Sequence, residues 1–210
     1  MLEFTEYTRF LIGLLAIVDP IGVIPIFLAM TVNYALEERR KIIQMIIIAV
    51  VSILFVALLF GEILLEFFGI SINSFRVGGG ILLLLMAINM MQSKDDAARK
   101  GKPSEFKDHN GSIAVVPLAM PLLAGPGAIS AVIIEAHRHD TVMHYAFLGF
   151  IILILGMIIW ALFQLTPWLS RHLSMMGISI ITRIMGLLLA AISIEFIANG
   201  LKGLFPSLAS

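Results

Sequence analysis

Long apolar stretches separated by short polar ones dominate the pattern of this chain. Six blocks are mostly apolar over about 20 residues or more, the length that an α-helix needs to cross a bilayer. They cover residues 7–30, 42–67, 73–92, 113–135, 142–166 and 179–204. The pattern predicts an all-α membrane protein with six transmembrane helices, and it leaves no stretch long enough for a separate soluble domain.

The one long polar connection divides the chain near its midpoint. Residues 93–112 (SKDDAARKGKPSEFKDHNGS) are charged, contain Gly and Pro, and have almost no apolar side chains that could pack into a core. We therefore expect a single transmembrane domain over residues 1–210. It would consist of a first repeat (1–92), a polar cytoplasmic loop (93–112) and a second repeat (113–210).

Short motifs recur in the two halves at a nearly constant offset of 106 to 108 positions, about half the chain. The pairs are Gly69–Ile72 with Gly177–Ile180, Arg76-x-x-Gly79 with Arg183-x-x-Gly186, and Pro20 with Pro126. Because each half would hold three helices, an odd number, the second half must insert upside down relative to the first. Two inverted three-helix repeats are typical of secondary transporters.

Lysine and arginine are unequally divided between the two faces that six helices would produce. The face that holds both termini carries Arg9, Arg138 and Lys202. The opposite face carries nine basic residues: Arg39, Arg40, Lys41, Lys94, Arg99, Lys100, Lys102, Lys107 and Arg171. Since Lys and Arg are enriched on the cytoplasmic side, we expect a multi-pass protein of the plasma (inner) membrane with both termini external, or periplasmic.

Two of the expected helices, the first and the fourth, contain residues that interrupt helical hydrogen bonding. The prolines there remove backbone donors, and together with their neighbours they form the candidate set: Asp19, Pro20, Gly22 and Pro25 in helix 1, and Gly125, Pro126, Gly127 and Ser130 in helix 4. Irregular backbone at membrane depth is tolerated only where it is buried in protein or lines a wet cavity. We predict that both helices are broken near the midplane, and that these eight residues bind substrate through half-helix N-termini and freed carbonyls. The alternative is a pair of packing kinks whose backbone groups are satisfied by neighbouring helices.

Charged residues inside the expected helices are a second group of candidates. A carboxylate at a helix centre costs roughly 2.5–3.5 kcal/mol on insertion scales, so Asp19 needs interior partners. It would bind a coupling ion, bind the amine of a substrate, or cap the second half-helix. Arg76, Arg183 and Glu195 are candidates for gating or ion coupling. Their alternative role is interfacial, with the long side chains turned toward the wet ends of the helices.

Several classes of chemistry find no support in the chain. It has no cysteine, no H-E-x-x-H zinc motif and no G-x-S-x-G nucleophile motif, so we expect neither an enzyme nor a bound cofactor. The polar cluster His137, His139 and His144 with Glu135 and Asp140 is interpreted as interfacial rather than as a metal site.

The expected partners are a small-molecule substrate, H⁺ or Na⁺ as alternative coupling ions, and membrane lipid. Nucleic acid is not among them. The sequence leaves the substrate, the coupling ion, the direction of transport and the oligomeric state open.

Three segments resemble motifs of the MarC family of membrane proteins: Asp19–Phe27, Pro117–Ser130 and Ile181–Leu189. The resemblance extends over essentially the whole chain, including its length and its central polar loop. It implies a relationship to the lysine-exporter superfamily and to a branch that transports glycine and alanine. We therefore predict a secondary transporter of a small solute, a small neutral amino acid, working by alternating access. The alternative is a non-transporting membrane factor that binds partners through residues 93–112.

Overall fold

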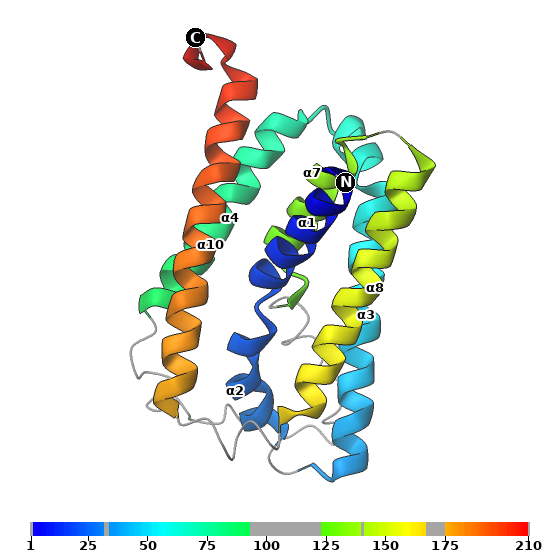
Figure 1. The fold of residues 1–210 in the computed structure, drawn as a ribbon, viewed down its shortest axis with the longest axis vertical. Coiled ribbons are helices and arrows are strands. Elements are labelled where there is room, and N and C mark those ends of the chain that lie inside the picture. The colour runs from blue at the N-terminus through cyan, green and yellow to red at the C-terminus, as the bar shows by residue number, and fades with distance from the viewer. Residues whose placement is uncertain (1, 32–33, 93–122, 140, 167–174, 210) are drawn as a thin grey trace.

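The computed structural model describes residues 2–31, 34–92, 123–139, 141–166 and 175–209, which form a bundle of helices (Figure 1). The elements are α1 (Leu2–Val18), α2 (Pro20–Thr31), α3 (Leu36–Phe67), α4 (Ile72–Gln92), α7 (Pro126–Ala136), α8 (Val142–Gln164), α10 (Met175–Leu204) and the 3₁₀ turn η1 (Pro206–Ala209). No strand occurs in these ranges.

Five stretches of the described chain are long and apolar enough to cross a membrane. They are Thr5–Ile24, Leu36–Phe67, Ile72–Gln92, Val142–Gln164 and Arg183–Leu204. The prediction of an all-α membrane protein is therefore confirmed. In the fourth expected span, residues 113–122 lie outside the described residues, and the remainder contains α7, an apolar helix of 11 residues.

Helix α3, the second of the expected spans, begins earlier than the apolar pattern predicted, at Leu36 instead of residue 42. Its first turn is polar, and the carboxylate of Glu38 accepts the backbone N–H of Ala35 at 3.0 Å. Glu37 and Glu38 also place negative charge at the positive end of the helix dipole, which stabilises a helix start. Apolar content alone does not reveal such a turn.

The connection between α3 and α4 explains the first of the repeated motifs. Gly69 adopts a left-handed φ of 65°, and the N–H of Ile70 donates to the carbonyl of Leu65 at 2.9 Å. Ser71 then accepts the backbone N–H of Ser74 on its hydroxyl oxygen at 3.1 Å, which caps α4. The motif Gly69–Ile72 is thus a helix stop followed directly by a helix start.

The helices of the first half pack against helices of the second half. α4 lies along α10, α3 packs against α8, and α1 packs against α7. In Figure 1, α4 and α10 form one edge of the bundle, α3 and α8 form the opposite edge, and α1 and α7 lie between the two pairs. α7 also contacts α3 and α4, so it links both edges.

Glycines allow α4 and α10 to approach closely. A Cβ atom on Gly80 would lie 2.9 Å from the carbonyl oxygen of Ser193, one on Gly186 would lie 3.2 Å from that of Ala87, and one on Gly200 would lie 2.9 Å from that of Asn73. Small residues at such positions let two membrane helices pack backbone against backbone.

Candidate functional site

The chain is broken between α1 and α2 at Asp19, which is 8% exposed and adopts a left-handed φ of 41°. Its carboxylate accepts the backbone N–H of Gly22 at 3.2 Å. Pro20 begins α2, where its missing N–H leaves no donor unsatisfied. A Cβ atom on Gly22 would collide with the Asp19 carboxylate. The capping role considered for Asp19 is therefore present, and its binding roles stay predictions.

The second break precedes α7. Gly125 is extended at the N-cap, with φ −65° and ψ 173°, and Pro126 occupies the first turn of the helix. A Cβ atom on Gly127 would collide with the Leu83 side chain of α4 and lie 3.4 Å from Ile17 Cγ2 of α1. Gly127 thus allows three helices to meet at this break. Residues 117–122, which complete the expected motif, lie outside the described residues.

The other two predicted binding residues flank these breaks. Ser130, 2% exposed, packs under α4, where a Cβ atom on Gly79 would lie 2.7 Å from its Oγ. Pro25 lies within α2, and its side chain is outside the described residues. The close neighbours observed at Gly22, Gly127 and Ser130 are therefore groups of the protein itself.

A pocket of about 660 Å³ opens between α1, α4, α7 and α10. Its volume lies within the range of roughly 300–1,000 Å³ typical of small-molecule sites. Its polar lining consists of Glu6, Arg9, Arg76, Glu135, Arg138, Glu195 and Asn199. Its apolar lining reaches down α1 to Ile17, the residue that meets Gly127. The pocket therefore extends along α1 as far as Ile17, beside the break at Gly127.

The charges of this pocket are partly paired. Nη1 of Arg138 lies 3.3 Å from Oε1 of Glu135, and Nδ2 of Asn199 donates to Oε1 of Glu195 at 3.0 Å. Arg76 is half-buried and, within the described part of the chain, forms neither a hydrogen bond nor an ion pair. The pocket therefore presents a cation whose donors are not used by the described residues, next to carboxylates that can take further donors.

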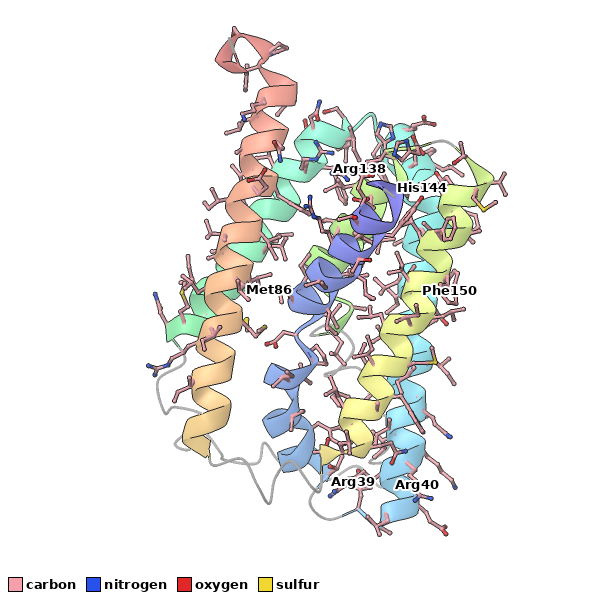
Figure 2. The ribbon with its side chains drawn as sticks, viewed as in Figure 1. Arg39, Arg40, Met86, Arg138, His144 and Phe150 are labelled. Atoms are coloured by element: carbon pink, nitrogen blue, oxygen red, sulfur yellow. The ribbon has the colours of Figure 1, made fainter. Side chains whose placement is uncertain are left out.

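One wall of the pocket is fixed by a buried histidine. Nε2 of His144 donates to the carbonyl of Glu135 at 2.9 Å, and the hydroxyl of Tyr7 lies 2.8 Å from its Nδ1. Figure 2 shows His144 and Arg138 at the same end of the bundle, opposite Arg39 and Arg40. These bonds join the last turn of α7 to α8 and α1, so they hold Glu135 and Arg138 in place.

The pocket gathers two of the predicted gating candidates, Arg76 and Glu195, from α4 and α10. Arg183 is exposed on α10 and does not line it. Neither do the seven predicted binding residues whose side chains the structure describes, all but Pro25. Five polar residues of the lining were not predicted as site residues: Glu6, Arg9, Glu135, Arg138 and Asn199.

Helical spacing contains the signal that would have found most of these residues. Lining positions 131, 134 and 135 on α7 with 138 just after it, and 192, 195, 196 and 199 on α10, follow the i, i+3, i+4, i+7 pattern of one helix face. In both sets of lining positions the later residues are polar, and they lie at the same end of the bundle.

Comparison with known proteins identifies the same family that the motifs Asp19–Phe27, Pro117–Ser130 and Ile181–Leu189 resemble. The family model described as "MarC family integral membrane protein" matches residues 4–205. The chain belongs to the MarC family. It is 44% identical over 208 residues to the "UPF0056 membrane protein YhcE" of Escherichia coli (strain K12), covering 98% of this chain and 96% of that protein.

Similar proteins also occur in organisms other than Escherichia coli. The chain is 38% identical to the "UPF0056 membrane protein MJ1677" of Methanocaldococcus jannaschii over 91% of this chain and 93% of that protein. It is 34% identical to the "UPF0056 membrane protein YvbG" of Bacillus subtilis (strain 168) over 99% of both chains. No solved structure matches. The chain is thus an integral, multi-pass MarC family membrane protein.

Proposed function

We propose that this MarC family protein is a secondary transporter that moves a small neutral amino acid across the plasma (inner) membrane by alternating access. The observation that carries the proposal is the charged pocket that opens at one end of the bundle and extends to Ile17, beside the break at Gly127. A polar pocket that leads from one membrane face to broken helices is the arrangement expected of a transporter site.

The proposed architecture is six transmembrane helices in two inverted repeats, with helices 1 and 4 broken near the midplane. In support, α1 packs against α7, α3 against α8, and α4 against α10, so each helix contacts its expected counterpart from the other half. A two-fold axis in the membrane plane would relate the partners of each pair. If the two halves of an experimental structure superposed by rotation about the membrane normal instead, the inverted repeat would be contradicted.

The pocket has the chemistry to recognise a zwitterion. Arg76 offers unused donors to a carboxylate. Glu195, held by Asn199, offers a carboxylate to an ammonium group. Both side chains line the same pocket. Gly80 faces Ile197 and Gly200 faces Val77, so Arg76 lies about 9 Å further along the helix axes than Glu195, toward the end of the bundle where α4 begins. An amino acid that carries one positive and one negative charge would satisfy both groups.

The two breaks supply the moving parts of the proposed mechanism. α2 begins at Pro20 and α7 at Pro126, so each can change its angle without breaking helical hydrogen bonds within a continuous helix. Ile17, Leu83 and Gly127 would form the inner gate, and separation of these three residues would open the pocket toward the opposite face.

We propose that the pocket faces the external side, with both termini there and residues 93–112 in the cytoplasm. The basic residues Arg39, Arg40 and Lys41 at the other end of the bundle support this orientation. A reporter fused after Ser210 should be active outside, and one inserted within residues 93–112 should be active inside. An active cytoplasmic reporter at the C-terminus would contradict this orientation.

Uptake by purified protein in vesicles tests the proposed activity. Labelled glycine and alanine should accumulate above the level of empty vesicles, and H⁺ and Na⁺ gradients applied one at a time would identify the coupling ion. A panel of larger and charged amino acids serves as the comparison. If no solute is taken up under any gradient, the transport proposal is contradicted and partner binding through residues 93–112 becomes the better interpretation.

A further inference from the structure

A groove on the outer surface of the bundle runs between α3 and α8, away from the charged pocket. Its apolar part, of about 470 Å³, is lined by residues that include Ile47, Val51, Leu153 and Met157. Its polar part, of about 420 Å³, is lined by Arg40, Gln44, Trp160 and Gln164. The two parts share Gln44 and Trp160, so they form one continuous groove with a polar head and an apolar tail.

We propose that this groove is a specific binding site for one anionic glycerophospholipid, with the lipid phosphate at Arg40 and an acyl chain along α3 and α8. This inference goes beyond the proposed transport activity and does not depend on it. Both helices belong to the membrane-spanning set, so the groove faces lipid rather than water.

The dimensions of the groove match one leaflet. From Arg40 to Val51 along α3 is 11 residues, or about 16 Å at 1.5 Å per residue. Half of a hydrocarbon core about 30 Å thick is about 15 Å. A phosphate at Arg40 would therefore lie at the membrane surface while its acyl chain reaches the bilayer centre within the groove.

The residues at the head of the groove favour an anionic lipid. Arg40 is the basic residue that lines the polar part, and Trp160, 47% exposed, has the amphipathic ring that is enriched at the headgroup level. Two carboxylates stand nearby, at Glu37 and Glu38, and that of Glu38 accepts the Ala35 N–H. Figure 2 shows Arg39 and Arg40 together at this end of α3.

The floor of the groove is set by a glycine. A Cβ atom on Gly156 would lie 2.8 Å from Val51 Cγ2 and 3.6 Å from Ile47 Cγ2. The two helices therefore approach closely along their inner faces, while Met157, 62% exposed, stands at the rim. This leaves a channel open to the membrane along its length, which suits an acyl chain.

Lipid retention tests the proposal on the full-length protein. The protein is reconstituted in vesicles of equal parts phosphatidylglycerol and phosphatidylcholine, extracted in mild detergent, and examined by native mass spectrometry. About one phosphatidylglycerol should remain bound per chain, in preference to phosphatidylcholine. Arg40→Gln should weaken its retention about tenfold or more, because it removes a charged hydrogen bond to the lipid phosphate.

Two further variants separate the site from general surface charge. Lys41→Gln removes the same charge at an exposed neighbour outside the groove and should retain phosphatidylglycerol like the unmodified protein. Met157→Trp should fill the apolar part and lower retention without a change of charge. Equal retention of both lipids, equal losses in Arg40→Gln and Lys41→Gln, or a dimer that buries Trp160 with no lipid bound would overturn the proposal.

Discussion

The carboxylate of Asp19 accepts the backbone N–H of Gly22 at 3.2 Å, and a side chain on Gly22 would occupy the position of that carboxylate. The acid and the glycine therefore form one unit that restarts the helix after the break. A buried carboxylate in a membrane helix costs free energy, and the Gly22 N–H is one interior partner that offsets this cost.

Substitutions at Asp19 separate the cap from a role of the charge. Asp19→Asn keeps an oxygen acceptor and tolerates the left-handed backbone, so the protein in detergent should unfold near its normal temperature. Asp19→Ala should lower the free energy of unfolding by about 1 kcal/mol. Asp19→Gly should fall between them, because glycine accepts the positive φ but provides no cap.

Transport by the same variants assigns the function of the acid. Uptake retained in Asp19→Asn and reduced in Asp19→Ala supports the cap alone. Loss of uptake in a stable Asp19→Asn protein would instead assign a charge role to Asp19. Equal stability of the Ala and Asn variants would contradict the cap.

The contact between Gly127 and Leu83 predicts a coupled pair of substitutions. Gly127→Ala places a methyl group against Leu83 and should destabilise the protein, whereas Gly127→Ala with Leu83→Ala should be more stable than the sum of the single effects, by about 0.5–3 kcal/mol. Gly78→Ala is the control, since its added Cβ meets no atom within 4 Å. Additive effects in thermal unfolding would show that the two residues do not share this space.

The helical breaks could be predicted from sequence because proline and glycine change the backbone wherever they occur. The break at Asp19-Pro20 and the start of α7 at Pro126 follow from these local rules. The pocket could not be predicted in the same way. It depends on which faces of α1, α4, α7 and α10 meet, and Arg76 and Glu195 are 119 positions apart in the sequence.

The same limit explains what was proposed for the glycines. Substrate binding at Gly22 and Gly127 stays a prediction, and the protein groups that lie closest are Asp19 at Gly22 and Leu83 with Ile17 at Gly127. A glycine signals close approach, but the sequence does not say what approaches.

Arg76 and Glu195 should recognise opposite ends of the substrate. Arg76→Gln and Glu195→Gln should each raise the KM for alanine uptake about tenfold or more, because each removes a charged hydrogen bond. Propionate should inhibit the Glu195→Gln protein but lose effect on Arg76→Gln, and ethylamine should show the reverse. Lys202→Gln, an exposed charge change on α10 outside the pocket, is the control. Identical inhibitor profiles in both variants would contradict this assignment.

Alternating access of the pocket is the central claim, and thiol labelling at Ala131 measures it directly. Ala131 lines the pocket and is 4% exposed, and the chain has no native cysteine, so Ala131→Cys gives a single reporter. Ala57→Cys, buried on α3 outside the pocket, is the matched control. A small membrane-impermeant thiol reagent should label Ala131→Cys from the face that holds the termini, and substrate should slow this labelling. In inverted vesicles the same site should become reactive from the opposite face. Labelling from one face alone, under every substrate and ion gradient, would contradict alternating access.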